Sequence, residues 1–209
     1  MRALDLFCGA GGASMGLKLS GFDEIVGVDH LPQPNYPFEF VQGNALKYPI
    51  DGFDFIWASP PCQCFTVYRN NRARIKNTHE DLIEPTREKL TASGVYWAME
   101  NVPGSPLIDP IQLCGTSFGI PVRRHRLFET NFPVVPPACN HGAFTERRFP
   151  GSSNRPNGRT VCNVGEWRVP LAVQRECMQI DWMTVPELSQ AVPPVYSEFI
   201  GQNMPSKTT

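Results

Sequence analysis

The sequence lacks a charge imbalance of either sign and any long apolar run. Its 209 residues include 19 Lys and Arg against 20 Asp and Glu, which gives a net charge of −1. No overall field therefore attracts a polyanion, and contact with a nucleic acid requires a local basic face. No apolar segment approaches the roughly 20 residues that a membrane span needs, so we expect no contact with a membrane.

Metal-ligand spacings are also missing. The 7 cysteines form no CxxC pair, and no cluster of histidines accompanies them. Cys62 and Cys64 are too close in sequence for a standard zinc site, so the sequence predicts no metal. The opening MRALDLFCGAGG lacks the charged segment and cleavage site of a signal peptide. We therefore expect a cytoplasmic protein with reduced thiols.

What the sequence does contain is an alternation of strand-like and helix-like segments over its first hundred residues. This alternation predicts an α/β fold with a parallel sheet. The expected strands cover 3–7, 24–28, 38–42, 53–58 and 95–99, with a further one at 124–128, and the expected helices cover 13–19 and 81–91. Residues 30–37, HLPQPNYP, are too broken for a crossover helix, so one helix of the alternation is missing. The chain regains helical character over 173–204, with a closing helix beginning at Pro193-Pro194.

A glycine-rich turn, Cys8-Gly9-Ala10-Gly11-Gly12, joins the first predicted strand to the first helix. Glycines there let the backbone approach a ligand at the carboxyl edge of the sheet. Asp29 closes the second strand, where an acidic residue can bind ribose hydroxyls. GxGxxG and the P-loop are both absent, which favours a nucleoside-containing cofactor other than a dinucleotide or ATP.

Three further motifs follow predicted strands. Pro60-Pro61 fixes the backbone ahead of Cys62, an arrangement that suits a rigidly presented nucleophile. Glu100 ends the next strand, so its carboxylate is expected at the same sheet edge as Cys62. Arg124 and Arg126 lie on one face of an extended segment and could hold a carbonyl oxygen or a phosphate.

These motifs resemble those of the DNA (cytosine-5-)-methyltransferase family. DLFCGAGG is similar to its cofactor motif, PPCQ to its nucleophile motif, ENV to its glutamate motif and Arg124-x-Arg126 to its basic motif. Gln190 to Pro194, leading into Ile200-Gly201, is similar to the closing motif that packs back on the cofactor site. The motifs stand in the family's order from residue 5 to residue 201.

The resemblance implies a Rossmann-like methyltransferase sheet that uses S-adenosylmethionine to methylate carbon 5 of cytosine in DNA. It implies that Cys62 attacks carbon 6, Glu100 holds N3, and Arg126 with Arg124 holds O2 and lowers the thiol pKa. The target base would be flipped out of double-stranded DNA. The implied cofactor contacts are Asp5, Phe7, Cys8, Gly9, Gly11, Gly12, Asp29, His30, Asn44, Ala45, Pro60, Gln190 and Ala191.

The chain is short for this family. We expect a catalytic core over 1–132, a much reduced target-recognition lobe over 133–170, and a segment over 171–209 that packs back on the core. The expected DNA contacts are Arg69, Arg72, Arg74, Arg147, Arg148, Arg155 and Arg159. The compactness suggests a phage or mobile element, acting in the cytoplasm of a bacterium or an infected host, and the family suggests a restriction-modification context.

Two alternatives remain open from the sequence. The same chemistry could act on RNA or a free cytidine nucleotide, because a small lobe need not bind a duplex. The second alternative is a catalytically silent DNA-binding relative, although such a protein has no need of Cys62, Glu100 and both arginines. Oligomeric state does not follow from the sequence.

Overall fold

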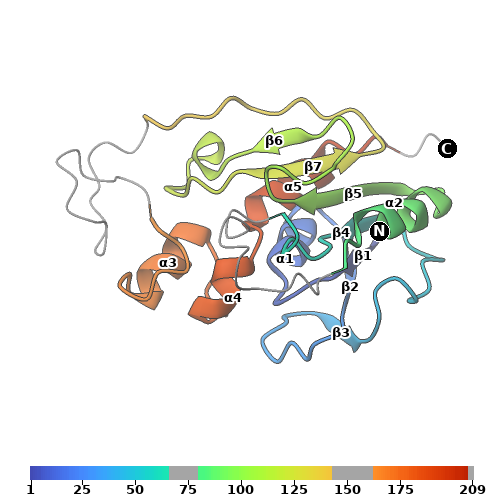
Figure 1. Cartoon of the computed structure of the whole chain (residues 1–209), viewed down its shortest axis with the longest axis horizontal. Coiled ribbons are helices and arrows are strands. Elements are labelled where there is room, and N and C mark those ends of the chain that lie inside the picture. Colours follow the sequence, from blue (N-terminus) through green and yellow to red (C-terminus); the bar gives the residue numbers. More distant parts are fainter. Residues whose placement is uncertain (66–79, 143–161, 207–209) are drawn as a thin grey trace.

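The computed structural model describes residues 1–65, 80–142 and 162–206. Within them the centre is a seven-stranded sheet in the order β3-β2-β1-β4-β5-β7-β6 (Figure 1). The first five strands pair in parallel, whereas β7 runs antiparallel to both β5 and β6. The predicted α/β class is confirmed. The strands are β1 (Arg2–Leu6), β2 (Glu24–Asp29), β3 (Glu39–Gln42), β4 (Phe55–Ala58), β5 (Tyr96–Asn101), β6 (Ile111–Leu113) and β7 (Arg126–Thr130).

Helices cover both faces of this sheet. They are α1 (Gly12–Leu19), α2 (Ile83–Ala92), α3 (Leu171–Met178), α4 (Val185–Gln190) and α5 (Pro194–Gln202), with a 3-10 turn η2 at Gly115–Phe118. Side chains of a strand alternate between faces. Ala3 accordingly packs with α1 and α5, while Leu4 and Leu6 pack with α2.

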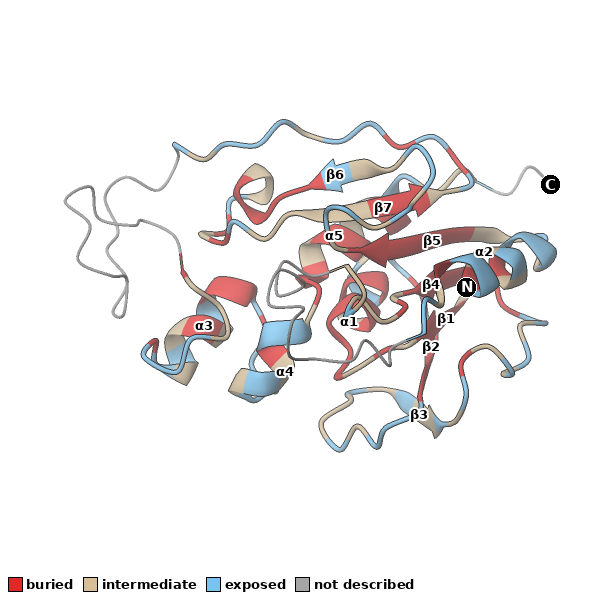
Figure 2. Cartoon of the chain, viewed as in Figure 1, coloured by how far each residue is buried: buried red, intermediate tan, exposed pale blue. Residues whose placement is uncertain are grey.

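The central strands are buried on both faces, as their nearly continuous apolar sequences predict. All four residues of β4 are buried, whereas the edge strands β3 and β6 are partly exposed (Figure 2). A third cluster of apolar side chains lies among α3, α4 and the turn after β1. The indole N–H of Trp182 donates to the Ala10 carbonyl at 2.8 Å and so joins this cluster to the turn.

The starts of α4 and α5 in the C-terminal segment are determined by local sequence signals. Thr184 and Glu187 form a capping box at the start of α4, and Pro194 opens α5. α5 lies against α1, where the Ser197 hydroxyl donates to the Ala13 carbonyl at 2.7 Å. Residues near the two ends of the chain therefore form one helical layer beneath the sheet.

The fold departs from the sequence prediction mainly beyond β5. No helix covers 30–37, as expected, but the three-residue strand β6 was not predicted. The strand predicted at 124–128 begins at Arg126, because the Arg124 carbonyl accepts the Tyr196 hydroxyl at 2.6 Å instead of pairing with a strand. None of the helices in the described ranges is both long and apolar enough to cross a bilayer.

Candidate active site

The turn after β1 presents backbone at the carboxyl edge of the sheet. Phe7, Gly9 and Gly11 have positive φ angles of 59°, 49° and 85°. The Gly9 N–H donates to Asp29 Oδ2 at 3.0 Å, which fixes the turn against the end of β2. A Cβ at Gly9 would meet no atom within 4 Å. The turn is thus held in place while its outer side stays open to a ligand.

Asp29 is the acidic residue predicted to bind ribose. It is buried, and its second oxygen accepts the Leu31 N–H at 3.0 Å. Its neighbour His30 is exposed, with Nδ1 3.2 Å from Asp29 Oδ1. Each carboxylate oxygen has a second lone pair, so Asp29 can still accept bonds from hydroxyl groups.

Asp5 lies deeper than the sequence indicated. It is fully buried in β1, and Ser14 donates to its Oδ2 at 2.5 Å. Its other oxygen, Oδ1, has no hydrogen-bond partner among the described residues. Desolvation raises the pKa of Asp5 to about 7, and the nearby Asp29 adds to the rise. An unpartnered buried acceptor beside the glycine turn fits a site built for a polar ligand.

The remaining residues predicted to contact the cofactor differ in how far they are buried. Gly12 begins α1 against the Val192 carbonyl, which brings the closing motif beside the turn. Cys8 and Ala45 are buried in the core, while Asn44 and Gln190 are exposed and Ala191 is half-buried. Burial raises the pKa of the Cys8 thiol, so it stays protonated.

Cys62 follows β4 on a short loop. The nearby Pro60 is buried, and its carbonyl accepts a hydrogen bond from Asn101 Nδ2 at 2.9 Å, which ties the loop to the end of β5. The Phe65 N–H donates to the Cys62 carbonyl at 2.8 Å. The thiol itself is half-buried, which leaves it reachable from one side.

Glu100 and Arg126 form a buried ion pair. Glu100 is the fifth residue of β5 and only 7% exposed, and its Oε1 lies 2.9 Å from Arg126 Nε. The guanidinium also donates to the His125 carbonyl at 2.9 Å. Desolvation raises the pKa of Glu100, whereas Arg126 and then Arg124 oppose the rise.

Ser59 is a polar neighbour that the sequence reasoning missed. Its hydroxyl accepts the Trp57 indole N–H at 2.9 Å and is hydrogen-bonded to Glu100. The signal was present in the sequence, because Ser59 directly precedes the two prolines. Ser59 therefore helps to fix the carboxylate that faces Cys62.

Arg124 is positioned by the C-terminal helices. Its guanidinium donates to the Ser189 carbonyl in α4, and its carbonyl accepts the buried Tyr196 hydroxyl of α5. Its Nε is buried and has no hydrogen-bond partner in the part of the chain that the structure describes. Desolvation and the like charge of Arg126 lower the pKa of Arg124 to about 9, so the side chain remains cationic at neutral pH.

The charges around Cys62 act in opposite directions. Burial and then Glu100 raise the pKa of the thiol, while Arg126 and Arg124 lower it. The sequence predicted only the lowering, and the net direction is the reverse. The main reason is burial of the thiol. The Glu100 carboxylate adds to it and offsets the nearby arginines, because its ion pair with Arg126 cancels much of the field that the arginine would exert.

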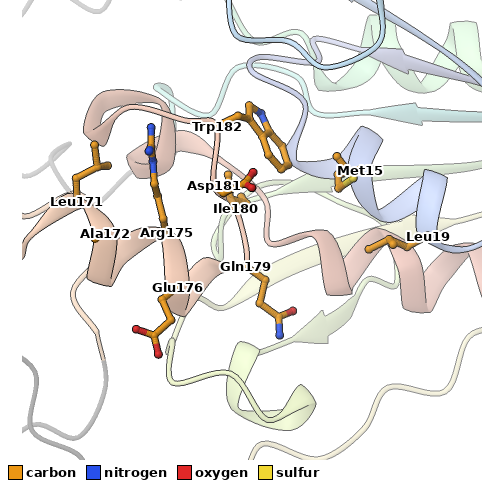
Figure 3. A pocket seen from close by; sticks show the side chains of 10 residues that line it. All are labelled: Met15, Leu19, Leu171, Ala172, Arg175, Glu176, Gln179, Ile180, Asp181 and Trp182. Atoms are coloured by element: carbon orange, nitrogen blue, oxygen red, sulfur yellow. The ribbon is translucent and has the colours of Figure 1, made fainter.

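The predicted DNA contacts Arg69, Arg72, Arg74, Arg147, Arg148, Arg155 and Arg159 lie outside the described residues. A separate open hollow of about 840 Å³ lies between α1 and α3 (Figure 3). Met15 and Leu19 line one side, and Arg175 and Trp182 line the other. It contains none of the described residues predicted for catalysis or cofactor binding.

Comparisons with known proteins agree on one family. The family model described as "C-5 cytosine-specific DNA methylase" matches residues 1–105, half of the chain. Type II methylase M.HgiDII of Herpetosiphon aurantiacus is 32% identical over 115 residues, which are 48% of this chain and 32% of the relative. Type II methyltransferase M.DdeI of Desulfomicrobium norvegicum is 27% identical over 118 residues, 50% of this chain and 28% of the relative. The match thus spans about a third of these relatives.

A solved structure supports the fold over nearly the whole length. It is an E. coli protein encoded within a prophage and assigned as a DNA modification methyltransferase. It superposes with a TM-score of 0.67 at 16% identity, covering 97% of each chain. The predicted Rossmann-like methyltransferase sheet is confirmed.

Proposed function

Since this chain belongs to the family of C-5 cytosine-specific DNA methylases, we propose that it methylates carbon 5 of cytosine in DNA with S-adenosylmethionine as methyl donor. The observation that carries the proposal is the buried Glu100–Arg126 ion pair beside the half-buried Cys62 thiol. A nucleophile with an acid and a cation at one sheet edge is the minimum for attack on a pyrimidine ring.

The turn after β1 has the features that a nucleoside cofactor needs. Gly9 and its neighbours would approach the methionine part, Asp29 would accept the ribose hydroxyls, and exposed Asn44 could accept an adenine amine. The unpartnered Asp5 Oδ1 and the open space beside Gly9 support this assignment. When bound, S-adenosylmethionine would supply an electrophilic methyl group on its sulfonium.

In the proposed mechanism Cys62 bonds to carbon 6 of the base as a thiolate. This addition makes carbon 5 nucleophilic, and after methylation carbon 5 loses its proton while the sulfur leaves. Glu100 in its protonated form would donate a hydrogen bond to N3, and its raised pKa favours that form. Arg126 and Arg124 would hold O2.

The raised pKa of Cys62 links its reactivity to the binding of the base. Burial raises the pKa of the thiol, and while Glu100 is ionised its charge adds to that rise. Once Glu100 is protonated at N3 of a bound base, the arginines are the remaining charges and favour the thiolate. Cys62 would therefore become more nucleophilic when cytosine occupies the site.

The substrate proposal includes a flipped base, because carbon 6 is inaccessible inside a duplex. We propose residues 1–132 as the catalytic core, 133–170 as a reduced recognition lobe and 171–209 as the segment that completes the site. Such an enzyme would work in the bacterial or phage-infected cytoplasm, and the related type II enzymes suggest a restriction-modification context.

Labelled S-adenosylmethionine tests the substrate directly. Wild type and Cys62→Ala would be incubated with duplex DNA, tRNA and dCMP. We expect label in DNA with wild type alone. Label only in tRNA or dCMP would change the substrate, and no transfer to any of them would favour a silent binder.

A duplex carrying 5-fluorocytosine tests the covalent step. Carbon 5 then has no proton to lose, so the adduct should persist on wild type and survive denaturing electrophoresis. A trapped complex on Cys62→Ala would rule out Cys62 as the nucleophile.

A further inference from the structure

Four potential metal ligands meet at the sheet edge formed by β6 and β7. Cys114 follows β6, and His125 directly precedes β7. Cys139 and His141 belong to the chain that leaves β7 and returns alongside both strands, drawn in yellow in Figure 1. Their side chains form one group whose ligand atoms all lie within 4.8 Å of one another.

Two sulfur–nitrogen distances in this group match those around a shared ion. Cys114 Sγ lies 3.6 Å from His141 Nε2, and Cys139 Sγ lies 3.6 Å from His125 Nε2. Two ligands of a tetrahedral zinc ion, one sulfur at about 2.3 Å and one nitrogen at about 2.0 Å, are separated by about 3.5 Å. The centroids of the two imidazole rings are 5.2 Å apart, and the ring planes are inclined by 68°.

The segment 133–142, which carries Cys139 and His141, is held by few other contacts with the described residues. Residues 133–142 have no helix or strand, and their backbone makes no backbone hydrogen bond to another described residue. Phe132 and Val134 are buried, but Val135 is 84% exposed. Cys139 and His141 make further contacts with the described residues, and the Arg123 guanidinium donates to the His141 carbonyl at 2.8 Å.

We propose that Cys114, His125, Cys139 and His141 bind one structural zinc ion. Two thiolates and two imidazoles are a donor set that selects Zn²⁺, and four protein ligands leave no open position for catalysis. The ion anchors residues 133–142 to the sheet. It also fixes His125, whose neighbours in sequence are Arg124 and Arg126.

The sequence prediction of no metal rested on spacing alone. The ligands occupy four places between residues 114 and 141, and only Cys139-Asn140-His141 are close in sequence. The antiparallel return of the chain along β6 and β7 brings them together. Spacing motifs detect sites built on one turn or knuckle, and this group is spread over a sheet edge.

Metal content of the full chain tests the proposal. Wild-type protein purified with zinc should contain about one zinc ion per chain by plasma mass spectrometry, and Cys139→Ala and His141→Ala should lose at least about nine-tenths of it. Cys62→Ala is the matched control: it removes a half-buried cysteine but should keep its zinc. Zinc retained by a folded Cys139→Ala variant would overturn the proposal.

Cobalt substitution gives a second readout that does not depend on the variants folding. Co²⁺ added to reduced, metal-free wild type should give the visible spectrum of a tetrahedral ion with thiolate ligands, and equimolar Zn²⁺ should abolish it. Absence of this spectrum together with absence of zinc would overturn the proposal, as would a Cys114–Cys139 disulfide in protein isolated under reducing conditions. A chelator should lower the melting temperature of wild type but not of Cys139→Ala.

Discussion

At the scale of single residues, the charge on Glu100 is one of the determinants of the Cys62 pKa. Burial and then the Glu100 carboxylate raise the pKa of the thiol, and the two arginines lower the pKa of both groups. A free enzyme with a protonated thiol is protected from oxidation and alkylation, because the thiolate is the reactive form. Reactivity at Cys62 is thus expected to follow the charge on Glu100.

The first prediction concerns Glu100→Gln. Because the neutral amide removes a negative charge beside the thiol, the pKa of Cys62 should fall and alkylation at neutral pH should be faster. The measurement is the pH profile of iodoacetamide alkylation at the Cys62 peptide by mass spectrometry. Methylation should meanwhile fall by about 10²-fold or more, since the proposed proton donor is gone.

Glu84→Gln provides its control. Glu84 pairs with Arg87 on α2, away from the thiol, so the alkylation profile should not move. A Cys62 pKa that is unchanged or higher in Glu100→Gln would contradict the proposed coupling.

The second prediction concerns Asp5. Its pKa is raised from 3.8 to about 7 in the folded protein, so the fold favours the protonated form. Between these values the folded state binds more protons than the unfolded chain, and stability therefore falls as pH rises from about 4 to about 7. The loss is at most on the order of 4 kcal/mol and is complete above pH 7.

Urea unfolding at pH 5 and pH 8 measures this dependence. Asp5→Asn cannot titrate, so its stability relative to wild type should improve at the higher pH. If the stability of both proteins changed equally with pH, Asp5 would not be the cause of the pH dependence. The comparison with wild type removes the contributions of all other groups.

At the scale of elements, α1 follows the glycine turn and packs against α5, the helix that helps to position Arg124. Gly16 lies where a Cβ would come 1.9 Å from the Pro194 carbonyl and 2.1 Å from Ser197 Oγ. The same α5 contributes Tyr196, whose hydroxyl holds the Arg124 backbone. Moving α5 would therefore disturb both the cofactor turn and the basic motif.

The third prediction follows for Gly16→Ala. The added methyl group must push α5 away from α1, and overpacking of this kind costs about 1–3 kcal/mol or more. The midpoint of urea unfolding should fall accordingly. Gly43→Ala is the matched control, because a Cβ at Gly43 meets no atom within 4 Å; an equal loss in both variants would contradict the packing argument.

At the scale of the whole molecule, a net charge of −1 gives no general attraction to DNA. Binding must then depend on local arginines, and the sequence concentrates Arg147, Arg148, Arg155 and Arg159 in one segment. These residues lie outside the described ranges, so their role is predicted from the sequence alone.

The fourth prediction concerns the double variant Arg147→Gln, Arg148→Gln. Each lost phosphate contact should reduce the slope of log affinity against log salt by about 0.9. Fluorescence anisotropy with a labelled duplex over a range of salt concentrations measures this slope. Lys18→Gln, an exposed cation on α1, should leave it unchanged; a normal slope in the double variant would remove these arginines from the interface.

The sequence by itself determined the class of fold and the positions of the motifs. Continuous apolar runs are local signals, and they predicted β1 to β5 within a few residues. The glycine turn and Pro60-Pro61 are also local, and so is the absence of a helix over 30–37. Family resemblance rests on the same short segments, which explains why half of the chain suffices to show it.

Only the tertiary structure decided what depends on neighbours distant in sequence. The short strand β6, the inward burial of Asp5 and the net direction of the Cys62 pKa all arise from packing and charge across the sheet. The group of Cys114, His125, Cys139 and His141 arises in the same way. Spacing along the chain does not encode these proximities, because an antiparallel return brings together residues whose sequence separation follows no fixed period.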